Sequence, residues 1–198
     1  MSKKNKGYDL LWEGITEKDF INESDNLIDE DIASFDIDAM TFFSQNVNLL
    51  RHLPRLADSL KPVERRGLMS LYDTKTLPDS KQKKSSRIVA ETMISHAHGD
   101  NSIYGTLAGM VQPWKNPVPL VNGVQTNFGN DEHPSGYAHM RYTEMKMSKY
   151  AYECFFKDYD EDCIETVFNT AKDGYEPLAL PSRFPNILVN GGFGYCNS

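Results

Sequence analysis

Two helical patterns separated by a short break do most to constrain the fold of this chain. In KKSSRIVAETMISHAHGDNSIYGTLAGMVQPW, apolar residues recur every three or four positions on both sides of His-Ala-His-Gly. Ser85 or Ser86 can cap the first helix, and Asp100 or Asn101 can cap the second. We expect their buried side chains to be Ile88, Val89, Thr92, Met93, Ile103, Tyr104, Leu107 and Met110. Such a pair is a helix-turn-helix candidate, although most helical hairpins bind no DNA.

The flanking segments predict a mixture of helices and strands. The apolar spacing predicts a helix over residues 32–50. A second helix is expected to begin at Ser59 or at Lys61-Pro62, because proline is tolerated in a first turn. Residues 117–142 are rich in Gly, Asn and Pro and predict a small β wing that leads into a helix carrying Tyr142. Short strands separated by turns are expected after residue 163. The predicted fold class is α+β, with a helix-turn-helix and a wing at its centre.

Positive charge is concentrated in one segment. The chain has a formal net charge of −7, yet residues 51–87 hold ten Lys or Arg against four Asp or Glu. Residues 1–50 hold four basic residues against eleven acids. A basic segment inside an acidic chain is typical of a phosphate-binding face, since each neutralised phosphate releases counterions. The alternative is a solvated face of mixed helices.

Metal and membrane sites receive little support from the sequence. No apolar run approaches the roughly 18 residues that span a bilayer, and the three scattered cysteines form no disulfide framework or CxxC pair. A reducing cytoplasm is the expected compartment. A zinc site from His96, His98 and His133 is conceivable by residue type, but no cysteine lies at useful spacing, so we expect no metal site. No GxxxxGK[ST] loop for ATP is present.

Several ordered motifs resemble one enzyme family. They are LPRLADSLKPVERRGLMSLYD, the helical pair above, PLVNGVQTNFGN, AHMRYTEMKMSK and LPSRFPNILVNG. In order and spacing they are similar to the DNA breakage-reunion chain of type IIA topoisomerases, the A subunit of DNA gyrase and of topoisomerase IV, including viral versions. The resemblance covers roughly residues 43–194. It implies a winged-helix DNA cleavage domain of an ATP-hydrolysing type II topoisomerase.

The resemblance assigns the nucleophile to Tyr142, with Arg141 beside it. A phenol must lose its proton as it attacks a phosphodiester, and a guanidinium stabilises the pentacovalent phosphate, so the pair suits a transient 5′-phosphotyrosyl break. Without the resemblance, Tyr142 is one of ten tyrosines and more simply a buried aromatic. Arg51 is implied to reach the scissile phosphate. The implied DNA contacts are Lys61, Arg65, Arg66, His96, His98 and a base-pair wedge at Tyr195; the two histidines are alternatively helix-cap or turn residues.

The resemblance also predicts domains and partners. Residues 1–31 are expected to form an acidic N-terminal arm, residues 32–160 the winged-helix breakage-reunion domain, and residues 161–198 the truncated start of a tower domain. Such an N-terminal fragment lacks most of the tower and the coiled-coil gate. Mg²⁺ and ATP are expected on a partner that resembles the gyrase B chain, with ATPase and Toprim folds. This chain would form a homodimer within a heterotetramer on double-stranded DNA, in the cytoplasm of a bacterium or infected host. The alternative function is a truncated, non-catalytic DNA-binding fragment, and a transcription-factor-like winged helix is a more distant rival.

Overall fold

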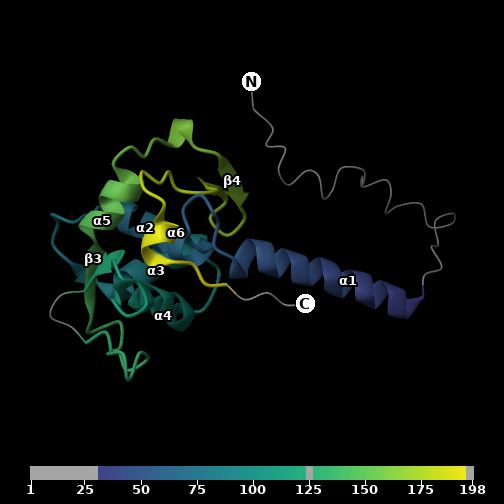
Figure 1. Cartoon of the computed structure of the whole chain (residues 1–198), viewed down its shortest axis with the longest axis horizontal. Coiled ribbons are helices and arrows are strands. Elements are labelled where there is room, and N and C mark those ends of the chain that lie inside the picture. Colours follow the sequence, from purple (N-terminus) through teal and green to yellow (C-terminus); the bar gives the residue numbers. More distant parts are fainter. Residues whose placement is uncertain (1–30, 124–126, 195–198) are drawn as a thin grey trace. The chain divides into compact units, whose positions relative to one another are not determined.

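The computed structural model describes residues 31–123 and 127–194 (Figure 1). By its contacts the chain divides into two units, residues 1–47 with 198 and residues 48–197. In the first unit, α1 (Ile32–Val47) is a 16-residue helix without a buried side chain. It confirms the helix predicted from residue 32, although the α-helical part ends at Val47.

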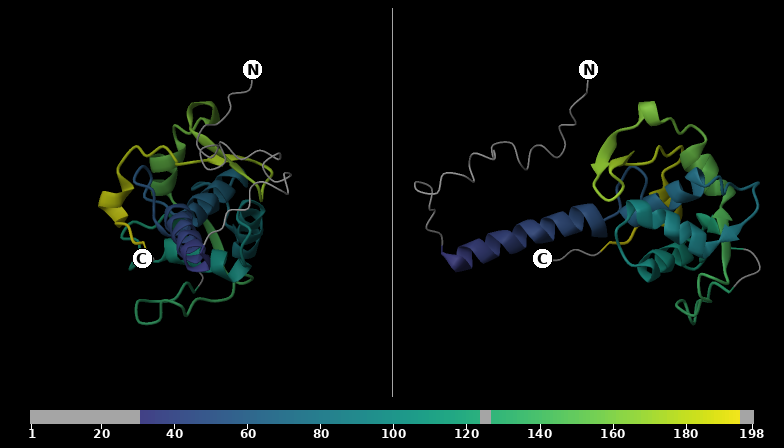
Figure 2. Two further views of the ribbon diagram at one scale, coloured as in Figure 1. Left: turned by 90° about the vertical axis from the view of Figure 1, so that its right-hand side faces the viewer. Right: turned by 180° about the vertical axis from the view of Figure 1, so that it is seen from behind.

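Three helices build the core of the second unit. α2 (Pro62–Asp73), α3 (Ser85–Ser95) and α4 (Asp100–Val111) pack against one another in pairs, as the two further views also show (Figure 2). Seven of the eight side chains predicted to be buried in α3 and α4 are buried. Met93 is the exception, with 43% of its surface exposed.

The helix starts differ from the prediction in one respect. α2 begins at Pro62, as expected, and the Glu64 carboxylate accepts the Lys61 amide at 2.8 Å. The residues preceding α3 and α4 are Lys84 and Gly99, and neither helix has a side-chain cap. The expected caps at Ser85 or Ser86 and at Asp100 or Asn101 were therefore wrong. Each of these residues lies inside the first turn of its helix.

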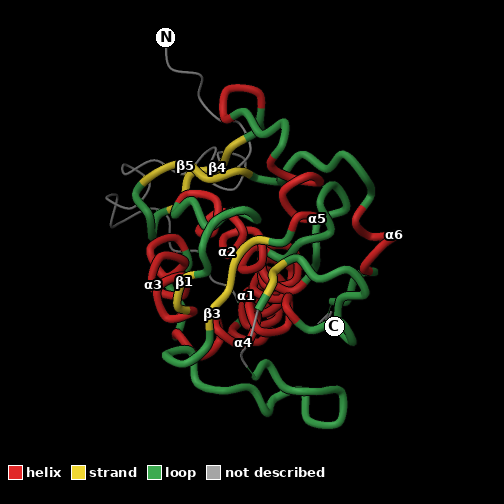
Figure 3. The backbone as a smooth tube through the Cα atoms, turned by 90° about the vertical axis from the view of Figure 1, so that its left-hand side faces the viewer, coloured by secondary structure: helices red, strands yellow, loops and turns green. Residues whose placement is uncertain are grey.

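A small antiparallel sheet packs against the helices. Its strand order is β1 (Lys83–Lys84), β3 (Glu144–Met147), β2 (Val121–Asn122). Alternate residues of β3 are buried, so Met145 and Met147 face the core. The prediction that a helix carries Tyr142 was wrong, because this residue lies in a turn just before β3. The strand β3, which begins two residues after Tyr142, pairs with β1 and β2 (Figure 3).

The remaining elements follow β3 along the chain. A short helix α5 (Lys149–Ala151) continues into a π-helical turn (Tyr152–Phe156), followed by a 3₁₀ turn (Glu161–Cys163). β4 (Thr166–Asn169) and β5 (Gly174–Pro177) form an antiparallel hairpin, and α6 (Asn186–Asn190) comes last. The short strands predicted after residue 163 are confirmed, and the fold class is α+β. None of the helices in the described ranges is long and apolar enough to cross a membrane.

Candidate active site and nucleic-acid interface

Arg141 and Tyr142 lie on an exposed turn, residues 139–142. The Tyr142 amide donates to the His139 carbonyl at 2.8 Å, which closes the turn. The Tyr142 side chain is 65% exposed, and the Arg141 guanidinium lies 5.8 Å from the centre of its ring. His139 Nδ1 accepts the Arg141 amide at 3.3 Å and its Nε at 3.4 Å. The phenol and the guanidinium therefore lie together in solvent, where both can reach a large anionic ligand.

The backbone on both sides of the Arg141–Tyr142 pair is bound by α3. The Ser85 amide donates to the Thr143 carbonyl at 2.9 Å, and the Ser86 amide donates to the Met140 carbonyl at 3.2 Å. These are the first two residues of the helix, whose amides have no acceptor within the helix itself. The two carbonyls flank Arg141 and Tyr142. The exposed pair is thus attached at both ends to the N-terminus of a core helix.

A second group of predicted residues gathers around His96. Its Nδ1 lies 2.7 Å from Arg66 NH1, and its ring centre lies 4.4 Å from that of His98. Burial lowers the pKa of His96 to about 4, and the positive charges of Arg66, His98 and Arg51 contribute to this lowering. Because a guanidinium only donates, Nδ1 must be the acceptor and Nε2 carries the proton. We call Arg51, Arg66, His96 and His98 the His96 cluster.

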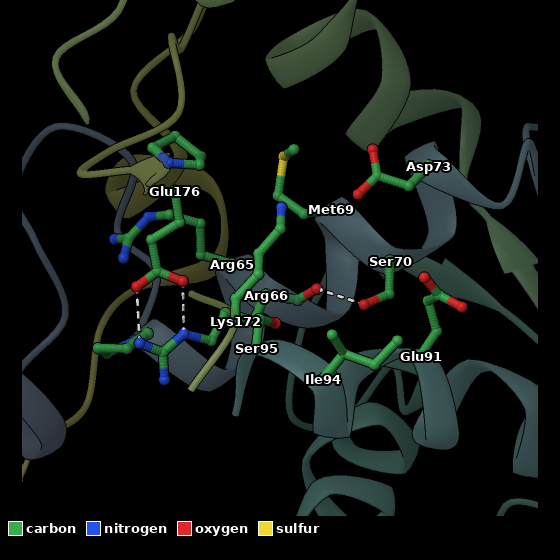
Figure 4. A pocket seen from close by; sticks show the side chains of 12 residues that line it. Arg65, Arg66, Met69, Ser70, Asp73, Glu91, Ile94, Ser95, Lys172 and Glu176 are labelled. Atoms are coloured by element: carbon green, nitrogen blue, oxygen red, sulfur yellow. Dashed lines mark hydrogen bonds and ion pairs between the residues drawn. The ribbon is translucent and has the colours of Figure 1, made fainter. Parts of the chain in front are cut away.

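Arg66 also holds the β4–β5 hairpin (Figure 4). Its Nε and NH2 donate to the two carboxylate oxygens of Glu176, at 2.8 and 2.6 Å. Asn169 Nδ2 donates to Glu176 Oε2 and to the Ser95 carbonyl, both at 2.7 Å. Arg66, Ser95 and Glu176 border a cavity of about 80 Å³ between α2, α3 and the hairpin. No sequence motif indicated Glu176, because its partner lies 110 residues earlier in the chain.

Arg65 was expected to contact DNA, but its side chain is buried, unlike that of the neighbouring Arg66. It is 5% exposed, and its Nε and NH2 donate to the Asp58 carboxylate at 2.6 and 3.0 Å. NH2 also donates to the Leu60 carbonyl at 3.0 Å. Asp58 in turn accepts the amides of Leu60 and Leu180 at 3.0 and 2.9 Å. This guanidinium has no exposed face for a phosphate, and its place in the structure is that of a buried ion pair.

Among the other basic residues of this segment, some form ion pairs and others do not. Lys84 forms an ion pair with Glu144 at 2.8 Å. Lys61 is partly exposed, and its Nζ lies 5.9 Å from the centre of the Phe193 ring. Tyr195 lies outside the described residues. The basic segment therefore offers fewer free charges than its composition predicts.

The two candidate groups remain separate within one chain. Across residues 31–123 and 127–194, no hydrogen bond, ion pair or ring contact joins Arg141 or Tyr142 to the His96 cluster. The same ranges contain no group of three or more His, Cys, Asp or Glu arranged to hold a metal ion.

The comparisons with known proteins agree on one family. The family model of the DNA gyrase/topoisomerase IV A subunit matches residues 51–196. The DNA gyrase A subunit of Mycolicibacterium smegmatis is 45% identical over 153 residues, which is 77% of this chain and 18% of that protein. The gyrase relative from Nocardioides sp. is 45% identical over 145 residues, 73% of this chain and 15% of that protein. The relative from Staphylococcus epidermidis is 43% identical over 153 residues, 77% of this chain and 17% of that protein.

The chain matches only a small part of each relative. The chain spans less than a fifth of the length of each of the three relatives. All three are bacterial, so they give no support to the expectation of a viral protein. The family match itself covers most of the chain and includes Arg141, Tyr142 and the whole His96 cluster. The chain belongs to the family of DNA gyrase and topoisomerase IV A subunits.

Proposed function

We propose that this chain is the DNA-cleaving, winged-helix part of a type II DNA topoisomerase. The observation that carries the proposal is the exposed Arg141–Tyr142 pair, whose flanking carbonyls, those of Met140 and Thr143, are both bound by α3. An exposed nucleophile on rigid backbone is what attack on a large, stiff substrate requires. In this proposal α3 and α4 form the helix-turn-helix, and β2, β3 and their connection form the wing.

The reaction is a reversible transfer of a phosphoryl group. The Tyr142 hydroxyl loses its proton as its oxygen attacks a backbone phosphorus, and the bond from phosphorus to the 3′ oxygen breaks. The 3′ oxygen gains a proton, and the 5′ phosphate stays linked to the tyrosine. Arg141 stabilises the negative charge on the phosphate as this bond forms. Resealing is the reverse reaction, and the phosphotyrosyl bond replaces the broken one without oxidation or reduction.

Two copies of the chain complete the proposed site. Among the described residues, no contact joins Tyr142 to the His96 cluster of its own chain, so we propose that the cluster binds near the phosphate that a second copy attacks. Arg51, Lys61, Arg66 and His98 would then contact the backbone, with Tyr195 at the bases. His96, which is buried and neutral, would orient Arg66. We leave Arg65 out of this proposed set, because its guanidinium is buried against Asp58.

The partner and cofactors follow the family. We propose that Mg²⁺ and ATP are bound by a partner resembling the gyrase B chain, in a heterotetramer with two copies of this chain, in the cytoplasm. Cleavage would then require the partner.

Covalent capture of DNA tests the proposal. The chain is mixed with a bacterial gyrase B protein, Mg²⁺ and supercoiled DNA, and protein-linked breaks are counted after denaturation. Tyr142→Phe should abolish the adduct and leave DNA affinity within about twofold, because it removes only the attacking oxygen. Tyr175→Phe, at an exposed tyrosine of the β4–β5 hairpin, is the matched control and should keep the adduct.

Each other outcome has a definite meaning. An adduct that persists in Tyr142→Phe would overturn the assignment of the nucleophile. DNA binding by the unmodified chain without any adduct would favour the non-catalytic DNA-binding fragment instead.

A further inference from the structure

Three buried hydroxyl groups lie beneath the Arg141–Tyr142 turn. Tyr104 of α4 is 4% exposed, and Thr143 and Ser85 are fully buried. The Tyr104 hydroxyl donates to the Ala138 carbonyl at 2.6 Å and lies 2.9 Å from Thr143 Oγ1. Thr143 Oγ1 lies 2.7 Å from Ser85 Oγ. The three hydroxyls therefore connect α4, the residue after Tyr142 and the first residue of α3.

The Tyr104 hydroxyl contacts residues on both sides of the turn. Ala138 and Thr143 lie just outside its two ends, so the Tyr104 hydroxyl is in contact with the backbone on one side and a side chain on the other. The Tyr104 ring packs edge-on against Tyr137, with 5.2 Å between ring centres, and this packing does not involve the hydroxyl. Burial raises the pKa of Tyr104, so the hydroxyl stays protonated and remains a donor. A phenylalanine would keep the packing and lose only these contacts.

We infer that Tyr104, acting through Thr143 and Ala138, is a positioning residue that fixes the turn carrying the nucleophile Tyr142. The catalytic part of this inference rests on the proposed function. α4 is the second helix of the helix-turn-helix, so the hydroxyls tie the position of a proposed DNA-binding helix to that of the attacking oxygen. A displacement of about 1 Å at a reacting group can slow a reaction by roughly a hundredfold.

Two variants and two controls test this role in catalysis. Tyr104→Phe and Thr143→Val remove hydroxyls and keep the side-chain shape, whereas Thr143→Ser keeps the hydroxyl. Tyr150→Phe is the matched control, because the Tyr150 hydroxyl donates elsewhere, to Asn186 Oδ1 at 3.2 Å. With gyrase B protein, Mg²⁺ and DNA, we expect adduct formation to slow about ten- to a hundredfold in Tyr104→Phe and Thr143→Val. Thr143→Ser, Tyr150→Phe and the DNA affinity of all four variants should stay within about twofold.

Hydrogen exchange supplies a readout that does not depend on activity. Amides of residues 139–143 should exchange faster in Tyr104→Phe and Thr143→Val than in the unmodified chain, because the turn opens more often. The β4–β5 hairpin should exchange unchanged, which separates a local effect from general loss of stability. Unchanged exchange at residues 139–143, or faster exchange with an unchanged rate of adduct formation, would overturn the inference. If the unmodified chain forms no adduct, the proposed function fails, and exchange still decides whether Tyr104 fixes the turn.

Discussion

Arg66 and Glu176 form a two-bond ion pair between α2 and the β4–β5 hairpin, with N–O distances of 2.8 and 2.6 Å. The same guanidinium contacts His96 Nδ1 at 2.7 Å. Paired charges of this geometry are strong and directional. A DNA phosphate that binds Arg66 must therefore compete with Glu176 or share the guanidinium with it.

Glu176→Gln should strengthen DNA binding. The variant removes the competing charge and keeps an amide of similar shape, so Arg66 becomes available to a phosphate. We expect the slope of log K against log salt to steepen by about one, and affinity at low salt to rise several-fold. Fluorescence anisotropy over a salt series measures both. Glu153→Gln makes the same charge change at an exposed pair with Lys157 and is the control. Equal slopes in the two variants would contradict a direct role for Arg66.

Arg65→Ala and Lys61→Ala should have opposite signatures. Removal of Arg65 leaves the Asp58 carboxylate buried and uncompensated, which typically costs about 3–5 kcal/mol of unfolding free energy. Lys61 is partly exposed and has no ion pair among the described residues, so Lys61→Ala should lower the salt slope by about one with little change in stability. Urea unfolding and anisotropy measure the two effects. A lowered slope in Arg65→Ala at unchanged stability would show that Arg65 binds phosphate after all.

The helical core could be predicted from the sequence because its signal is local. Apolar spacing in α3 and α4 identified seven buried side chains, and only Met93 was placed on the wrong face. The turn at Tyr142 could not be predicted in this way. Its conformation depends on the Ser85 and Ser86 amides and on strand pairing with β1, which come from more than fifty residues earlier in the chain. Local patterns carry no information about such partners.

The candidate site was only partly predictable for the same reason. Arg65 and Arg66 are adjacent in the sequence and equally basic, yet a helix turns by about 100° between neighbours. Arg65 therefore faces Asp58 in the interior, and Arg66 faces His96. Glu64, the residue before them, accepts the Lys61 amide with its carboxylate at the start of α2, so it helps begin the helix. Assigning these roles required the spatial neighbours of each residue.

Gly67→Ala should destabilise the contact between α2 and α4. A Cβ at this position would lie 2.8 Å from Leu107 Cδ2, and Leu107 is fully buried. Overpacking of this kind costs about 1–3 kcal/mol. Gly109→Ala is the control, because its Cβ would meet only Lys115 at 3.7 Å. There the helical preference of alanine should dominate and add up to about 1 kcal/mol. Equal effects on the urea midpoint in the two variants would argue against a tight contact at Gly67.

Acid should weaken the fold through His96. Its pKa is about 4 in the folded chain, below the ordinary value near 6.5, because of burial and the charges of Arg66, His98 and Arg51, with Glu176 acting in the opposite direction. Between these two values the unfolded chain binds more protons than the folded chain. The contribution to stability is therefore complete above about pH 6.5 and is lost as the pH falls toward 4. The total loss from this residue is at most about 3 kcal/mol.

Urea unfolding of the unmodified chain and of a His96 variant, at pH 7 and at pH 5, measures how much of the acid sensitivity comes from His96. His96→Asn keeps an acceptor opposite Arg66 and cannot titrate, so it should lose less stability between the two pH values than the unmodified chain. His133→Asn removes an exposed histidine and should keep the full loss. If His96→Asn loses as much stability on acidification as His133→Asn, the acid sensitivity arises elsewhere, and His96 is not the neutral acceptor that holds Arg66.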